Sequence, residues 1–187
     1  MAEKPSVHQY IGGTAAWRRL AVAFYSRVDR DPLLRPLFPG KTLHCAIEGF
    51  TAFLVQLFDG PSVDTQRRWW LSLRESHLRF QIQCQERAAW MENMVNALDD
   101  ARIEEPLRSA LREFFERSSA YVVNSGERDH AVESSEPPGD AIRQEIAQRW
   151  EAQRTLDDAV AAVREGEADR AIAAAETFQH NRQACSR

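Results

Sequence analysis

The chain has 187 residues, 43% of them hydrophobic, which is enough to bury the core of one domain and leave a further segment. Its 24 basic and 28 acidic residues give a net charge of -4, so no strongly basic surface favours nucleic acid as a partner. We expect a cytoplasmic protein with no membrane span, disulfide framework or structural zinc, because apolar runs stay below about 18 residues and the cysteines lack zinc spacing.

Residues 10–29 contain the glycine pair Gly12-Gly13, and the first expected helix follows this pair. Its large apolar residues recur at spacings of three and four: Trp17, Leu20, Phe24 and Val28. This spacing places them on one face of an amphipathic helix.

A proline-rich connection and a second helix follow. Prolines interrupt helical geometry at Asp31-Pro32, Pro36 and Pro39-Gly40. Leu37 and Phe38 lie in this irregular connection. The second helix begins after Thr42, and Asp59-Gly60-Pro61 predicts its end. Its broad apolar face comprises Cys45, Phe50, Phe53, Leu54 and Phe58.

A histidine lies in the unusually apolar and aromatic stretch of residues 69–94. Trp70, Leu73 and His77 are three and four residues apart, so they share one helical face, and Phe80 and Ile82 lie in the connection after it. A neutral imidazole in apolar surroundings is a good ligand for haem iron. On this stretch alone, a structural histidine without a metal is the more common case.

Two further helices complete the first part of the chain. Residues 86–99 carry an inward stripe of Trp90, Met94 and either Ala97 or Leu98. A helix from about Pro106 to Asn124 has these candidates for burial: Leu107, Leu111, Phe114, Phe115 and Tyr121. No segment alternates with the period of two that a half-buried strand requires, so the predicted class is all-α.

Composition divides the chain into a domain over residues 1–125, a linker over residues 126–140 and a helical tail over residues 141–187. The tail is predicted to contain helices at 141–153 and 156–179, the second interrupted at Gly166. Their apolar positions at helical spacing are Ile142, Ile146 and Trp150, then Leu156, Val160 and Val163. Such amphipathic helices require a partner face.

The order of these landmarks resembles that of the group II truncated haemoglobins, over residue 10 to about residue 124. The landmarks are the helix ending in FY, the LF of the proline-bounded connection, the helix ending at DGP, and the sequences SHLRF and RAAWMENM. The resemblance implies an all-α, globin-like two-over-two helical sandwich with a C-terminal helical extension. It also implies haem b as the cofactor.

The resemblance assigns roles to individual residues. His77 matches the ligand of the iron, while Tyr25 and Trp90 match hydrogen-bond donors to the bound gas. Ala46 matches the distal-helix position that faces the iron, and a slip of one or two residues in the helix start instead brings His44 to the pocket mouth. The other residues assigned to the haem contact are Phe38, Phe50, Phe53, Leu73, Arg74, Phe80, Ile82 and Met94, together with Trp90.

Three details remain open at this stage. The basic residue that pairs with a haem propionate in this family is replaced by Gly49. The candidates to replace its contact are Arg67, Arg68, Arg74 and Arg79, since a guanidinium binds a carboxylate through two hydrogen bonds. The alternative is that all four are solvated surface arginines. The other imidazole N–H of His77 has a backbone carbonyl one turn earlier as its more common partner, ahead of Ser76 or Glu75. Cys45 and Cys84 are expected to be buried small hydrophobic residues.

The resemblance implies that the protein binds dioxygen, nitric oxide and carbon monoxide, with nitric oxide detoxification or peroxide chemistry as the enzymatic consequence. No flavin or nicotinamide motif occurs in the chain, so this chemistry requires an external reductase. One alternative is a gas or redox sensor that signals through the tail, and another is an all-α interaction module without haem. The tail resembles the opening unit of an ankyrin array, or else forms a hairpin that docks on the globin, on a partner or on a second copy.

Overall fold

The computed structural model describes residues 6–58, 72–126 and 141–185, and these residues form helices and no strands. The helices are α1 (Val7–Ile11), α2 (Gly13–Val28), η1 (Arg35–Leu37), α3 (His44–Leu57), α4 (Leu73–His77), α5 (Cys84–Asp100), α6 (Leu107–Tyr121), α7 (Ala141–Glu165) and α8 (Ala168–Cys185). The predicted all-α class is therefore confirmed. The predicted helix end at Asp59-Gly60-Pro61, Trp70 and nearly all of the predicted linker lie outside the described residues.

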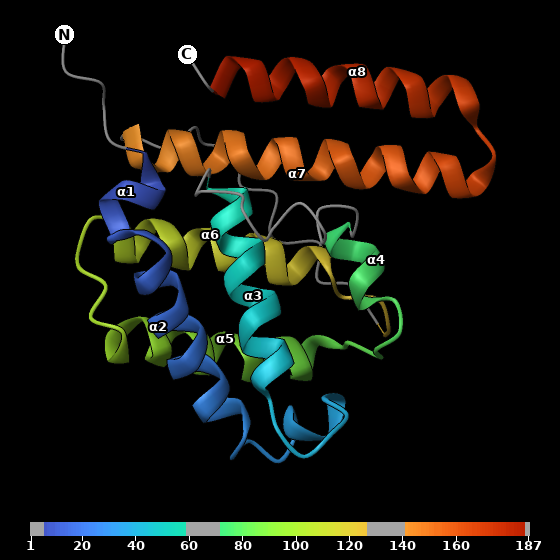
Figure 1. Cartoon of the computed structure of the whole chain (residues 1–187). Coiled ribbons are helices and arrows are strands. Elements are labelled where there is room, and N and C mark those ends of the chain that lie inside the picture. The colour runs from blue at the N-terminus through green and yellow to red at the C-terminus, as the bar shows by residue number, and fades with distance from the viewer. Residues whose placement is uncertain (1–5, 59–71, 127–140, 186–187) are drawn as a thin grey trace, which may run out of the picture.

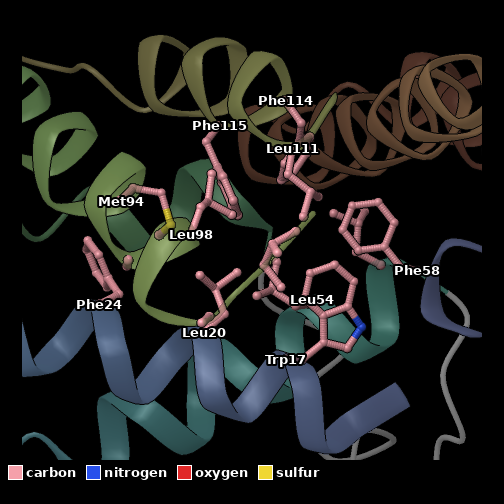
Figure 2. Close-up of a cluster of buried hydrophobic side chains, with 14 of the residues drawn as sticks. Trp17, Leu20, Phe24, Leu54, Phe58, Met94, Leu98, Leu111, Phe114 and Phe115 are labelled. Carbon is pink, nitrogen blue, oxygen red and sulfur yellow. The ribbon is translucent and has the colours of Figure 1, made fainter. Parts of the chain in front are cut away.

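The core is formed by two pairs of helices, α2 with α3 and α5 with α6, which pack on each other (Figure 1). Large side chains from all four helices fill the space between the pairs (Figure 2). Trp17 stacks on Phe58 at a centroid distance of 5.0 Å, and Phe58 meets Phe114 edge-on at 5.6 Å. This arrangement agrees with the two-over-two sandwich that the sequence predicts.

The apolar periodicity of α2 correctly predicts which residues it buries. Trp17, Leu20, Phe24 and Val28 are each at most 1% exposed. Gly12 ends α1 with a φ of 101°, a left-handed conformation that a side chain would strain, so the chain turns there before α2 begins. The Trp17 indole N–H then donates to Nδ1 of His8 at 3.2 Å and holds α1 against α2.

The two cysteines at helix starts depart from the prediction. Cys45 and Cys84 are exposed, although both were expected to be buried. Each lies in the first turn of its helix. Position on a helical face alone does not tell where along the helix the packing partner ends.

The tail packs on the first part of the chain through α7, which lies between α8 and the four-helix core (Figure 1). The Trp150 ring meets Phe114 edge-on at 5.8 Å and Tyr121 at 5.4 Å. Arg143 of α7 adds an ion pair to Glu113 of α6 at 3.0 Å. No helix within the described ranges is long and apolar enough to cross a membrane.

The tail helices differ from their predicted limits. The expected break between residues 153 and 156 is absent, because this stretch holds neither glycine nor proline and the Thr155 hydroxyl donates to the Glu151 carbonyl within the helix. Val163, predicted on the apolar stripe, is 68% exposed, whereas its neighbour Ala162 is fully buried. The turn at Gly166 is confirmed, since its φ of 75° ends α7 before α8 begins.

Candidate functional site

A series of aromatic contacts links His77 to the centre of the helical sandwich. The His77 ring lies 6.4 Å from Phe80, centroid to centroid, and Phe80 lies 6.4 Å from Phe38. Phe38 meets Tyr25 edge-on at 5.5 Å, and Tyr25 meets Phe50 at 6.2 Å. The fold thus gathers rings from α2, α3, α4 and two connections around one place.

Many apolar side chains of this region are only half-buried. They are Phe38, Ala46, Phe50, Phe53, Leu73, Phe80, Ile82 and Trp90. Met94, one turn beyond Trp90, is by contrast 0% exposed and belongs to the closed core (Figure 2). Apolar and aromatic side chains that their own fold leaves partly uncovered are a typical lining of a site for an apolar ligand.

Local hydrogen bonds fix the orientation of the His77 ring. Nδ1 lies 2.6 Å from the Leu73 carbonyl oxygen one turn earlier, so Nδ1–H donates to that oxygen, which is the partner expected from the sequence. The Ser76 hydroxyl lies 3.0 Å from the same nitrogen. Among the described residues no hydrogen bond uses Nε2, which leaves this nitrogen available to a metal.

The His77 imidazole is neutral at physiological pH. Burial lowers its pKa below the usual value because desolvation disfavours the charged form, and this effect outweighs the opposite effect of the Leu73 carbonyl. Only a neutral imidazole offers a lone pair to a metal. The site therefore presents the protonation state that a metal ligand requires.

Two hydrogen-bond donors of the region have no partner among the residues that the structure describes. Tyr25 is 8% exposed, and burial raises the pKa of its phenol, which stays protonated. Trp90 packs on Phe24 at 5.1 Å and on Phe115 at 5.7 Å. Within the described part of the chain, neither the Tyr25 hydroxyl nor the Trp90 indole N–H makes a hydrogen bond. An unsatisfied donor in such surroundings has free energy to gain from a bound acceptor.

The start of α3 supplies no polar side chain to the site. Ala46 is half-buried in the first turn of the helix, and Phe50 follows one turn later. The His44 side chain is 72% exposed and lies 4.0 Å from Glu48, so it faces away from the aromatic residues. The His44 side chain thus lies in solvent, whereas Ala46 and Phe50 pack against the core.

Two of the candidate arginines lie beside aromatic rings. The Arg79 guanidinium lies 4.8 Å from the centre of the Phe80 ring, at the edge of the site. Arg74 lies 5.7 Å from the Tyr121 ring, on the side of α4 that faces α7. Arg67 and Arg68 lie outside the described residues. Of the two described candidates, Arg79 is the one that lies beside a ring of the site.

Asn124, which the sequence did not single out, holds the connection after α4. Its side-chain amide donates to the carbonyl oxygens of His77 at 3.1 Å and Phe80 at 2.9 Å, and its oxygen accepts from the Ile82 N–H at 3.0 Å. One side chain thus fixes three points of the backbone around the histidine. The sequence shows only an asparagine at the end of a predicted helix, and because asparagine is common at helix ends, this position did not indicate a special role.

Arg35 similarly holds the connection that carries Phe38. Its guanidinium donates to the Phe38 and Gly40 carbonyl oxygens, both at 2.8 Å, and pairs with Asp29 at 2.9 Å. The neighbouring Asp31 carboxylate accepts from the Asn93 amide of α5 at 2.7 Å. The position of Phe38 therefore depends on polar contacts that periodicity does not predict.

The tail also reaches this region, since Arg164 of α7 forms an ion pair with Glu75 of α4, two residues before His77. The complete arrangement offers a neutral imidazole nitrogen, a partly open aromatic lining and two unpaired donors. This combination suits a flat, largely apolar group that carries a metal, with a small polar ligand beside Tyr25 and Trp90. Haem is such a group, and the residues present fit it.

Comparison with known proteins identifies relatives of the first part of the chain. The family model described as "Bacterial-like globin" matches residues 6–124. The group 2 truncated hemoglobin YjbI of Bacillus subtilis is 32% identical over 111 residues, which cover 59% of this chain and 83% of that protein. The two-on-two hemoglobin-3 of Arabidopsis thaliana is 29% identical over 118 residues, which cover 62% of this chain and 67% of that protein.

Solved structures agree with the sequence comparison. The hemoglobin of Chloroflexus aurantiacus is 39% identical, with a TM-score of 0.62, and the match covers 65% of this chain and all of that one. The truncated oxygen-avid haemoglobin of Bacillus subtilis is 31% identical, with a TM-score of 0.59, and the match covers 64% of this chain and all of that one. The family match ends before α7 and α8 begin.

Replacing Asn124 by alanine is expected to loosen the connection after α4. The change removes three hydrogen bonds to the backbone, so hydrogen exchange of residues 78–83 accelerates and the free energy of unfolding falls by about 1–3 kcal/mol. Hydrogen-exchange mass spectrometry and denaturant titration measure both effects. The control is Asn96→Ala, whose amide donates only to the Glu92 carbonyl on an exposed turn of α5. Equal exchange in the two variants contradicts the assignment.

Proposed function

Because the chain belongs to the bacterial-like globin family over residues 6–124, a family that binds gases through haem, we propose that it is a haem b protein that reversibly binds dioxygen, nitric oxide and carbon monoxide. The observation that carries the proposal is the neutral His77, whose Nδ1 donates to the Leu73 carbonyl, while Nε2 makes no hydrogen bond to any residue that the structure describes. That is the state required of a proximal ligand.

In this function His77 would hold the haem iron through Nε2, and haem would supply the metal that binds a diatomic gas. The Leu73 carbonyl keeps the imidazole in one tautomer and orientation and raises its strength as a ligand. The lining residues would contact the macrocycle and exclude water; Phe80 packs beside His77, and Phe38 packs beside Phe80. Arg79 or Arg74 pairs with a haem propionate, and the position of Arg79 beside Phe80 supports the first assignment.

In this function Tyr25 and Trp90 would donate hydrogen bonds to the gas. Both donors lie among aromatic rings, where little water competes for them and a hydrogen bond to a partly charged acceptor is strong. Ala46 leaves room beside them without adding a polar group. We infer that dioxygen is released slowly.

Oxygen-dependent detoxification of nitric oxide, or peroxide chemistry, is the enzymatic activity that we propose for this site. Slow release of dioxygen, which hydrogen bonds from Tyr25 and Trp90 would produce, supports the first of these activities. Repeated turnover requires a separate reductase that returns the iron to its ferrous state, since the chain has no flavin or nicotinamide motif. The described residues supply binding and orientation to this chemistry.

Gas or redox sensing through the tail is the second candidate. Its support is the direct contact of α7 with the helix of His77, through the ion pair between Arg164 and Glu75. A shift of α4 on ligand binding would reach α7 and then α8, where a protein partner or a second copy binds in this alternative. The resemblance of the tail to the opening of an ankyrin array is a further element of the same hypothesis.

Replacing His77 by alanine is expected to abolish specific haem binding, because no other side chain in the series of aromatic contacts offers an imidazole. The unmodified chain gives a Soret band after haem reconstitution, and His77→Ala loses it or shows the spectrum of non-specifically bound haem. The matched control is His44→Ala, since the His44 side chain is 72% exposed. A chain that gives no Soret band after reconstitution overturns the proposal.

Replacing Tyr25 or Trp90 by phenylalanine is expected to accelerate dioxygen dissociation about tenfold, because a hydrogen bond to a partly charged acceptor contributes roughly 1.5–3 kcal/mol. Stopped-flow or flash-photolysis kinetics measure the rate. The double variant belongs in the same series because the two donors share the ligand and their effects do not simply add. Tyr10→Phe, at a tyrosine that is 49% exposed, is the control. If the rate of dioxygen dissociation is unchanged in both single variants and in the double variant of Tyr25 and Trp90, other groups stabilise the gas.

If the tail transmits ligand binding, hydrogen exchange in α7 and α8 differs between the ferrous protein with and without carbon monoxide. Storage or detoxification alone needs no such difference, because α8 packs on α7, away from the site (Figure 1). Hydrogen-exchange mass spectrometry of the full chain distinguishes the two. Identical exchange in residues 141–177 removes the support for sensing.

A further inference from the structure

The helix that carries His77 is too short to hold its own position. α4 comprises five residues, Leu73–His77, and an isolated helix of that length is unstable because so few hydrogen bonds do not offset the cost of nucleation. Groups outside the helix must therefore fix its ends. Asn124 holds the C-terminal end through the His77 carbonyl oxygen.

A carboxylate of the tail holds the N-terminal end. Asp157 of α7 accepts hydrogen bonds from the backbone N–H groups of Leu73 at 3.0 Å and Arg74 at 3.1 Å. The Ser72 hydroxyl oxygen accepts from the next N–H, that of Glu75, at 2.9 Å. The first three N–H groups of α4 all have acceptors, and the charge of Asp157 lies where the peptide dipoles favour an anion.

The surroundings of Asp157 suit this contact. Asp157 is 3% exposed, whereas the next residue, Asp158, is exposed. The Gln153 amide donates to Oδ1 at 3.0 Å, and the nearby Tyr121 hydroxyl helps to lower the pKa of the carboxyl group. The pKa of Asp157 is raised above its usual value, because the effect of burial outweighs that of the hydrogen bonds that lower it. All its partners are donors, as an ionised carboxylate requires.

Leu73 connects Asp157 to the histidine. Its N–H donates to Asp157, and its carbonyl oxygen accepts from Nδ1 of His77 at 2.6 Å. The ion pair of Arg164 with Glu75 gives α7 a second hold on the same short helix. The backbone that orients the imidazole is therefore anchored to the tail.

We propose that Asp157 is a positioning residue for His77, through which the tail helix α7 sets the orientation of the imidazole and the strength of its bond to the haem iron. The proposal rests on the proposed haem function and gives the tail, which lies outside the residues matched to the family, a role in that site. Without the carboxylate, the N–H groups of Leu73 and Arg74 lose their acceptor, α4 loosens, and the ring adopts a range of orientations.

The test uses the full chain loaded with haem and compares Asp157→Ala and Asp157→Asn with the control Asp158→Ala. The control removes the same charge from an exposed neighbour on the same helix. Asparagine keeps the shape and one acceptor, so its effects are intermediate. We expect Asp157→Ala to release haem to excess apomyoglobin about tenfold faster, because charge-assisted hydrogen bonds of this kind change a rate by about that factor.

A spectroscopic signature separates positioning from a general loss of stability. In the ferrous protein, the resonance Raman band of the iron–histidine bond shifts or broadens in both Asp157 variants and keeps its wild-type position in Asp158→Ala. Hydrogen exchange of residues 72–77 rises in parallel. If Asp157→Ala does not fold, judged by its far-ultraviolet helical signal, Asp157→Asn carries the same comparison.

An unchanged iron–histidine band in the Asp157 variants overturns the proposal, even if hydrogen exchange of residues 72–77 has risen. A change of the same size in Asp158→Ala also overturns it, because the effect then comes from charge and not from the buried contact. Failure of the proposed haem function is a different result, in which the unmodified chain shows no Soret band at all.

Discussion

The site depends on one hydrogen bond, between Nδ1 of His77 and the carbonyl oxygen of Leu73. An imidazole that binds a metal through one nitrogen needs a partner at the other, because otherwise the ring rotates and its tautomer is not fixed. The partner here is the backbone carbonyl of Leu73 in a five-residue helix, so the position of this carbonyl depends on the position of the helix. The orientation of the histidine is therefore a property of the contacts that hold α4.

Those contacts come from two residues that lie far from α4 in the sequence. Asn124 binds the backbone at the C-terminal end of α4, and Asp157 binds the N–H groups at its N-terminal end. The aromatic residues around His77 add shape and a low dielectric, but they lack the polar groups that fix a backbone. Apolar packing thus defines where a haem fits, and a small number of buried polar side chains define the direction of the ligand.

Much of the fold follows from helical periodicity, because burial of one face is a local property of spacing. Trp17 and Phe24 are buried as their three- and four-residue spacing predicts, and the turn at Gly166 lies where the glycine indicates. The exposure of Cys45 was not predictable in this way, because helical spacing does not show which turns of a helix its neighbours cover. The family resemblance added what periodicity lacks, namely which of the apolar and polar residues gather around His77.

The sequence alone therefore determined the helical class, the main buried faces and the residues matched to a haem site. It did not distinguish Asp157 from Asp158, since adjacent carboxylates on a charged helix look alike in composition and spacing. Only the tertiary structure buries one and exposes the other, and it places the buried one against two N–H groups more than eighty positions away in the chain. The physical reason is that hydrogen bonds between distant segments depend on how helices are oriented in space, and local spacing carries no information on that orientation.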